Sequence, residues 1–181
     1  MVKNMKEIEL EKVYLIKNLP SNILDYEPMV IKVGDFFDSN SVNALKIRQK
    51  GDKYQLIKKE AGENEYKRTE HTIFIKKEEF DILWKQVEQN HSKLRFFYPL
   101  GEHTCEIDFY KDRLDGYVRA EVEFKSIEDM ENFVPPEWFK EEITKLNHEI
   151  HENLGLVTLD EMKERFAKNK IELIKVDFPK K

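Results

Sequence analysis

Residues 6–20, KEIELEKVYLIKNLP, alternate between acidic and apolar side chains near their start. Glu7, Glu9 and Glu11 are each separated by one apolar residue, a pattern typical of a β-strand, where alternate residues share a face. Three carboxylates this close repel one another, and an ordinary solvated face would mix in lysine or threonine. The stretch therefore predicts a strand with one acidic and one apolar face, and simple solvent exposure does not explain the acidic one.

The chain has 181 residues, with 31 basic and 36 acidic side chains and a net charge of -5. This length suits a single domain over residues 1–181, and the near balance of charge argues against a stable nucleic-acid partner. Cys105 is the only cysteine, which excludes an intramolecular disulfide and favours a reducing, cytoplasmic location. Because no signal peptide or membrane-spanning run is found, we expect a soluble protein without a membrane partner.

The rest of the chain alternates at first and then becomes helical. Residues 43–59 have two alternating arms around Gly51, which predicts a hairpin, and residues 76–90 switch to a helical period. Further strands are predicted at residues 66–75, 92–100, 103–111 and 117–125. Helices are predicted at residues 126–134, 136–155 and 158–169, with Ser126, Pro135 and Thr158 at or near their starts, followed by a closing strand over residues 171–176. The pattern indicates an α+β fold built on an antiparallel sheet or barrel, with its strands over about 6–125 and a helical region over about 126–181.

Charged side chains are segregated by strand. Carboxylates dominate one face of the first strand and of the last two, and cations dominate the strands between them. A sandwich with a solvated charged exterior would explain each strand taken singly. A barrel with its charged faces inward would explain the whole set, because buried charges of both signs need a ligand or a partner. Such a cavity suits a polyanion with a divalent metal, since carboxylates bind Mg²⁺ or Mn²⁺ and lysine and arginine bind phosphate.

These segments resemble, in order, the strands of the CYTH superfamily, the triphosphate tunnel metalloenzymes. ELEKVYLIKNLP is similar to the opening strand of that family, whose signature is Glu-x-Glu-x-Lys, and LKIRQKGDKYQLIKK is similar to its basic strands. KRTEHTIFI, SKLRFFYPL and CEIDFYKDRLDGYVRAEVEF resemble the later strands, and FVPPEWFKEEIT resembles the segment that follows. The similarity covers residues 7–144.

The resemblance implies an eight-stranded antiparallel β-barrel, with flanking and C-terminal helices, that binds a small triphosphate with Mg²⁺ or Mn²⁺. Carried over by position, the catalytic residues are Glu9 and Glu11. The metal-binding residues are Glu9, Glu11, Glu106, Asp108, Glu121 and Glu123, and the substrate-binding residues are Lys46, Arg48, Lys59, Arg68, Lys93 and Arg95. The implied activity is a triphosphatase acting foremost on inorganic tripolyphosphate. Thiamine triphosphate hydrolysis, ATP cyclisation and triphosphate or nucleotide binding without catalysis are the alternatives.

The chain departs from the family pattern at position 13. Val13 stands where the signature has lysine, and the neighbouring Lys12 falls on the opposite face of the strand. We expect Val13 to face the tunnel and Lys12 to face outward, so losing this cation would weaken the grip on phosphate. Two further features have simpler explanations: His148 and His151 lie one helical turn apart without a third metal ligand, and Cys105 is expected to be buried.

Overall fold

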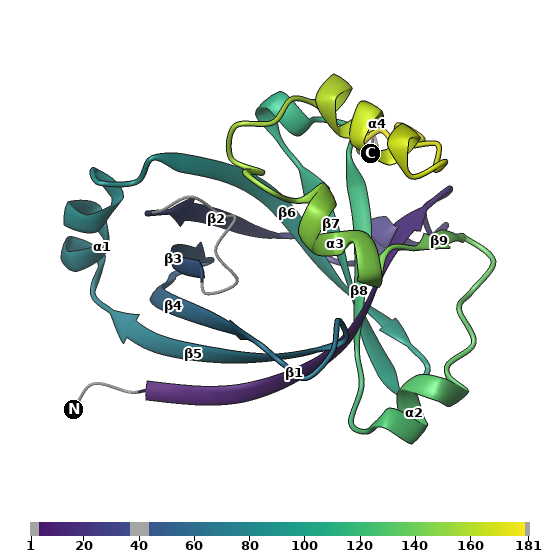
Figure 1. Cartoon of the computed structure of the whole chain (residues 1–181), viewed down its shortest axis with the longest axis horizontal. Coiled ribbons are helices and arrows are strands. Elements are labelled where there is room, and N and C mark those ends of the chain that lie inside the picture. The colour runs from purple at the N-terminus through teal and green to yellow at the C-terminus, as the bar shows by residue number, and fades with distance from the viewer. Residues whose placement is uncertain (1–3, 37–43, 180–181) are drawn as a thin grey trace.

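The computed structural model describes residues 4–36 and 44–179. Among them, eight strands form a closed antiparallel barrel in the order β5-β4-β3-β2-β6-β7-β8-β1, with β1 pairing back to β5 (Figure 1). The strands are β1 (Asn4–Ile16), β2 (Met29–Asp35), β3 (Ala44–Lys50), β4 (Lys53–Ala61), β5 (Lys67–Ile75), β6 (Gln89–Leu100), β7 (His103–Tyr110) and β8 (Val118–Glu123). The predicted barrel is confirmed, including the β3–β4 hairpin.

The first strand closes the barrel because it is long enough to pair with two neighbours in turn. Its first part, from Asn4 to Leu10, pairs with β5, and its second part, from Glu11 to Leu15, pairs with β8. Past the end of the β5 pairing, the edge of β1 that does not face β8 pairs with a ninth strand, β9 (Phe139–Glu142). The stretch that predicted an acidic strand is thus the seam of the barrel.

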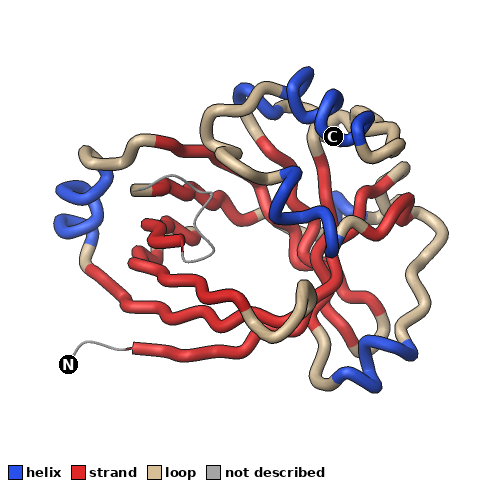
Figure 2. Tube along the Cα trace, viewed as in Figure 1, coloured by secondary structure: helices blue, strands red, loops and turns tan. Residues whose placement is uncertain are grey.

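The helices lie around the barrel rather than within it (Figure 2). They are α1 (Lys77–Trp84), which joins β5 to β6, α2 (Ile127–Asn132), α3 (Asn147–Ile150) and α4 (Leu159–Lys168), with short 3-10 turns η1 (Ile23–Asp25), η2 (Asp112–Leu114) and η3 (Thr144–Leu146). Ser126 and Thr158 cap α2 and α4 as predicted, each accepting a hydrogen bond from a backbone N–H in the first turn. In the described part of the chain, no helix is long and apolar enough to cross a membrane.

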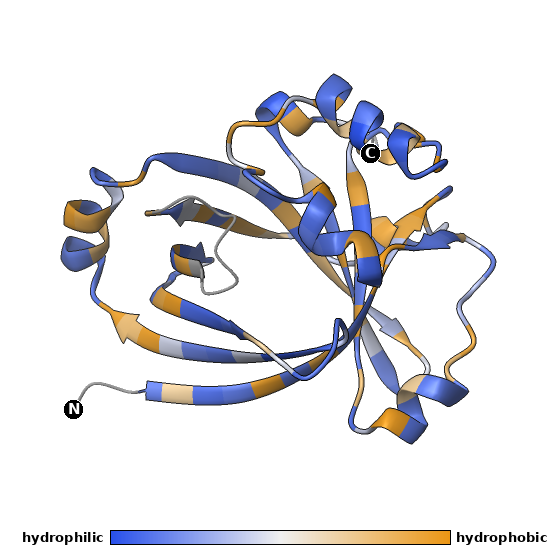
Figure 3. Ribbon diagram, in the orientation of Figure 1, coloured by the Kyte–Doolittle hydropathy of each residue, from blue (hydrophilic) through white to orange (hydrophobic). Residues whose placement is uncertain are grey.

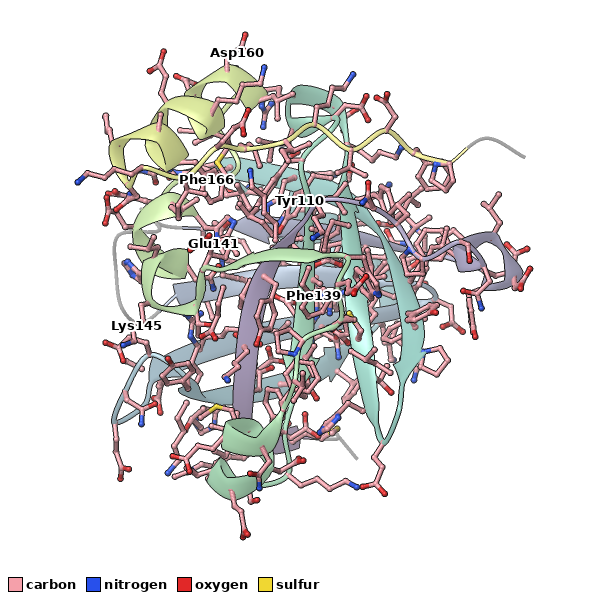
Figure 4. All side chains as sticks on the ribbon, turned by 90° about the vertical axis from the view of Figure 1, so that its right-hand side faces the viewer. Tyr110, Phe139, Glu141, Lys145, Asp160 and Phe166 are labelled. Carbon is pink, nitrogen blue, oxygen red and sulfur yellow. The ribbon has the colours of Figure 1, made fainter. Side chains whose placement is uncertain are left out.

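Apolar side chains pack on both faces of β1. Along the strands, apolar and polar residues alternate (Figure 3). One cluster lies outside the barrel wall and includes Phe109 and Cys105, whose predicted burial is confirmed. The other joins the wall to the C-terminal segment, where Tyr110 of β7 and Phe166 of α4 are both fully buried or nearly so (Figure 4). The C-terminal helices are therefore packed against one region of the barrel through an apolar contact.

Two predictions in the C-terminal region were wrong. Residues 136–155 do not form one helix from Pro135, because this segment begins as β9 and continues through η3 and α3. The unpaired backbone edge of β1 accounts for the difference, since pairing with β9 satisfies its N–H and C=O groups. Residues 171–176 form no strand either. Leu173 and Val176 are buried there without a strand ladder, and the backbone N–H of Val176 donates to the carbonyl of Gly116 at 3.1 Å.

Candidate active site in the barrel

The barrel holds a cavity of about 560 Å³ lined mainly by charged side chains. Among the described residues, ten Asp and Glu and ten Lys and Arg side chains line it, so its charges balance. The expectation of inward-facing charge is confirmed, and a solvated charged exterior does not describe this fold. The predicted residues brought together here are Glu9, Glu11, Lys46, Arg48, Lys59, Arg68, Lys93, Arg95, Glu106, Glu121 and Glu123.

On the wall formed by β3, β4 and β5, cations pair with carboxylates. Lys59 Nζ lies 2.8 Å from Glu9 Oε2 and 3.2 Å from Glu70 Oε2. Arg48 Nη2 donates to Glu70 Oε1 at 2.9 Å. Burial would raise the pKa of Glu70, but Lys59 and Arg48 outweigh it and lower that pKa to about 2. Arg68 lines the same wall, and the described residues include no carboxylate that forms an ion pair with it.

Arg95 of β6 is the centre of a buried ion-pair cluster. Its Nε donates to Asp108 Oδ1 and its Nη2 to Asp108 Oδ2, both at 2.6 Å, and Nη2 also lies 2.5 Å from Glu121 Oε2. Glu106 accepts from Arg95, and Asp108 also accepts from Lys93. Asp108 is fully buried beneath these cations and does not line the cavity. In this structure it anchors the cavity-lining Lys93 and Arg95 and is not open to a metal ion.

Carboxylates of β1 and β8 form the opposite wall. Glu11 and Glu123 are directly opposed in the strand pairing, which places two like charges side by side. Burial, followed by the charges of Glu121 and Glu9, raises the pKa of Glu11 to about 6. Burial also raises the pKa of Glu123, again with Glu9 and Glu121 contributing. At Glu121 burial is outweighed by Arg119 and Arg95, which hold its pKa well below the usual value, so the like-charge repulsion on this wall is concentrated at Glu11 and Glu123.

The donor set of this wall fits a divalent metal ion. Carboxylate oxygens are the ligands that Mg²⁺ and Mn²⁺ prefer, and a cation between Glu11 and Glu123 would relieve their repulsion. No three acidic, histidine or cysteine side chains of the described residues are clustered closely enough to form a complete metal site by themselves. Magnesium usually completes its coordination with water and substrate phosphate, so a partial protein site is compatible with it.

Val13 does not line the cavity, contrary to expectation. It lies on the barrel side of β1 opposite Glu121, but it has no exposed surface and packs in the apolar cluster with Tyr110 and Ile143. The cavity wall ends before position 13 because the C-terminal segment covers the strand there, and the backbone N–H of Ile143 donates to the carbonyl of Val13 at 2.7 Å. Lys12 faces away from the cavity, as predicted, and lies 3.8 Å from Glu142 of β9.

Several cavity residues were missed by the sequence analysis. Asp35 of β2 accepts a hydrogen bond from Lys46 at 2.6 Å, and the alternation of β2 could have identified it. The segment after β9 does not alternate between polar and apolar residues, so nothing in its sequence indicated that it faces the cavity. It contributes Thr144, Lys145, Asn147, His148 and His151 to the lining, and the strands add Lys50, Glu70, His91 and Arg119.

The two histidines of this segment are not a metal pair. His151 Nε2 lies 2.6 Å from the Tyr117 hydroxyl, and its Nδ1 lies 2.8 Å from the Asn147 carbonyl. Burial, with Arg119 nearby, lowers the pKa of His151 well below its usual value, so the ring is neutral at neutral pH. With both ring nitrogens engaged, His151 holds α3 in place, in agreement with the simpler explanation of the sequence.

A closed antiparallel barrel whose cavity is lined by charged side chains of both signs places this protein in the class of β-barrels of the triphosphate-tunnel type. The chain is 30% identical, over 140 residues, to an inorganic triphosphatase from Nitrosomonas europaea, covering 76% of this chain and 89% of that protein. A crystal structure of an inorganic triphosphatase superposes with a TM-score of 0.61 at 26% identity, covering 82% of this chain and 95% of that one. No family model matches the chain.

A Bacillus halodurans protein of solved structure shares the fold alone. It is 15% identical, has a TM-score of 0.51, and the match covers 97% of this chain and 96% of that one. The similarity to the Nitrosomonas protein extends over most of both chains and is accompanied by the same fold. The chain belongs to the CYTH superfamily, the family of the triphosphate tunnel enzymes.

Proposed function

We propose that this protein hydrolyses a small triphosphate, foremost inorganic tripolyphosphate, in its barrel cavity with Mg²⁺ or Mn²⁺. The observation that carries the proposal is the charge of the cavity lining, in which acidic and basic side chains are equal in number, with the carboxylates concentrated on β1, β7 and β8 and the cations on β3 to β6. A triphosphate alone would add several negative charges to a neutral cavity. A triphosphate accompanied by divalent metal adds far fewer, and each component has a wall of opposite charge.

The basic wall would bind the phosphate groups. Arginine presents a planar fork that matches phosphate oxygens, and lysine acts as a compact positive charge. Arg95 and Lys93 are held in place by Asp108, so they are oriented before any ligand enters. The substrate-binding set is Lys46, Arg48, Lys59, Arg68, Lys93 and Arg95, and the metal-binding set is Glu9, Glu11, Glu121 and Glu123 with Glu106.

The reaction would be in-line attack of water on a terminal phosphorus, with the pyrophosphate portion leaving. A bound divalent metal ion supplies charge neutralisation of the phosphate oxygens. The cations stabilise charge on the transferred group, which is the main protein contribution to phosphoryl transfer. Glu9 and Glu11 lie on the wall where a carboxylate can accept a proton from the attacking water or orient it.

Phosphate release from tripolyphosphate, ATP and thiamine triphosphate tests the proposal. We expect release from tripolyphosphate with Mg²⁺ or Mn²⁺, its loss on chelation, and its recovery when metal is restored. Glu11→Gln should abolish most of the activity. Lys12→Ala is the control, because Lys12 loses only an outer-face contact with Glu142. Absence of release from every substrate, or equal rates for wild type and Glu11→Gln, would contradict the proposal.

Binding without hydrolysis is the competing function, and the apolar environment of Val13 is the observation that favours it. A cavity that lacks one cation of the family signature could retain affinity and lose rate. Titration calorimetry with tripolyphosphate and Mg²⁺ separates the two functions. Binding without phosphate release would support a sensor, and turnover would exclude it.

A further inference from the structure

We propose that Arg119 of β8 binds substrate phosphate and thereby supplies the cation that position 13 lacks; this rests on the proposed triphosphatase function. Val13 is opposite Glu121 in the pairing of β1 with β8. A lysine at position 13 would have reached towards that carboxylate, since directly opposed residues have Cβ atoms about 4.5–5.5 Å apart. In this chain Glu121 is paired with Arg95 of β6 and, from its own strand, with Arg119.

Arg119 is two residues before Glu121 and therefore shares its inward face. Its Nη2 lies 2.5 Å from Glu121 Oε1, and its Nε lies 3.8 Å from Asp108 Oδ2. The guanidinium is 5.7 Å from the centre of the Tyr110 ring and is part of the cavity lining. The positive charge is thus next to the same carboxylate that Val13 faces.

The guanidinium retains hydrogen-bonding capacity that the protein does not use. Arginine has five N–H donors. The described residues satisfy part of them: Nη2 donates to Glu121, and Nη1 donates to Asn147 Oδ1 at 3.1 Å. Nη2 keeps a second N–H for which these residues supply no acceptor, whereas the unpaired Nε–H is too deeply buried to reach a ligand in the cavity. A phosphate oxygen is an acceptor that fits the arginine fork.

The C-terminal segment fixes the direction of this side chain. Asn147 accepts from Arg119 Nη1, and His151 Nδ1 lies 3.5 Å from the same nitrogen. His151 is itself held by the Tyr117 hydroxyl at 2.6 Å. Because α3 orients the guanidinium, the segment that buries Val13 also positions the cation that takes its place.

Steady-state kinetics with tripolyphosphate and Mg²⁺ test the inference. Arg119→Met should raise KM by roughly tenfold or more, the value of one charged hydrogen bond. Since the contact exists in both bound and transition states, kcat should fall much less. Arg113→Met is the matched control. Arg113 Nη2 donates to the Asn90 carbonyl at 3.0 Å and to that of Gly155, so it holds the C-terminal segment from outside the cavity.

A second variant keeps the test decisive. If Arg119→Met does not fold, Arg119→Gln replaces it, because its amide can still donate to Glu121. A folded Arg119 variant with wild-type KM, or an equal rise in KM for Arg113→Met, would overturn the inference.

Calorimetry with tripolyphosphate and Mg²⁺ keeps the two proposals separate. If the wild type binds without turnover, the proposed hydrolysis fails, and the affinity of Arg119→Met still decides the role of Arg119. We expect its dissociation constant to rise by roughly tenfold or more. If the wild type hydrolyses tripolyphosphate and the Arg119 variants match it in both assays, only the inference about Arg119 fails.

Discussion

Replacing Arg95 by methionine should lower the stability of the protein as well as its proposed binding of phosphate. The side chain makes its contacts with three carboxylates, and the most deeply buried of them, Asp108, has no exposed surface. Methionine keeps much of the volume of the arginine stem but removes every charged contact. The perturbation therefore leaves buried carboxylates with fewer cations, without opening a large cavity.

The expected loss of unfolding free energy depends on which cationic partners Asp108 would keep. Removing one partner of a buried ion pair typically costs about 3–5 kcal/mol, because the other charge is left uncompensated. Asp108 would retain Lys93 and, at 3.8 Å, Arg119. The lower end, about 3 kcal/mol, is therefore expected. For a chain of this size that loss lowers the melting temperature by roughly 6–12 °C.

Thermal and urea unfolding of wild type, Arg95→Met, Asp108→Asn and the double variant measure this effect. Neutralising Asp108 in the Arg95→Met background should restore part of the stability, since no buried charge is then left in excess. The coupling energy from the cycle should exceed about 1 kcal/mol for such neighbours. A coupling near zero, or an Arg95→Met variant as stable as wild type, would refute the view that Arg95 neutralises Asp108.

Two further perturbations concern pH and the C-terminal region. Because the pKa of Glu70 is lowered to about 2 in the folded protein, its ionised form contributes about 3 kcal/mol above pH 4.5, and this is lost as pH falls towards 2. Urea unfolding should therefore show Glu70→Gln less stable than wild type at pH 7, by a margin that narrows below pH 4.5; a margin that does not change with pH would contradict this. Phe166→Ala removes a fully buried ring, which should cost about 3–5 kcal/mol and, in calorimetry, shift one cooperative transition. A separate early transition would instead mean that the C-terminal region unfolds independently and that residues 1–181 are not one domain.

The alternation of side chains predicted antiparallel strands with one charged face, and the resemblance to the CYTH superfamily implied that they close into a barrel. In a strand the side chains alternate, so the charges of β1, β6 or β8 could be assigned to one face before the fold was known. Arg48 and Arg95 were placed correctly in this way, as was the outward direction of Lys12. The informative feature was the presence of several like charges on one face of a strand, which an ordinary solvated face does not show.

The parts that could not be predicted depend on contacts between distant segments. Val13 follows the alternation, yet it is covered because residues near Ile143 pair with β1, and nothing local to position 13 shows this. Phe139 and Ile143 are spaced as on a helix, and the free edge of β1 decides that the first lies in a strand. Asp108 was placed on the correct face but beneath Lys93 and Arg95, a depth that alternation cannot give.

The balance of charge in the cavity explains how such an interior can fold before any ligand binds. Lys59 is held by Glu9, and Lys46 by Asp35, so the cost of burying these charges is offset by pairs within the protein. When a phosphate enters, each of these cations exchanges one charge-assisted contact for another. Arg68 has no ion pair among the described residues, so a phosphate bound to it adds a contact without breaking one. The affinity of the site for phosphate should accordingly depend less on the total number of cations than on those that have no carboxylate partner in the folded protein.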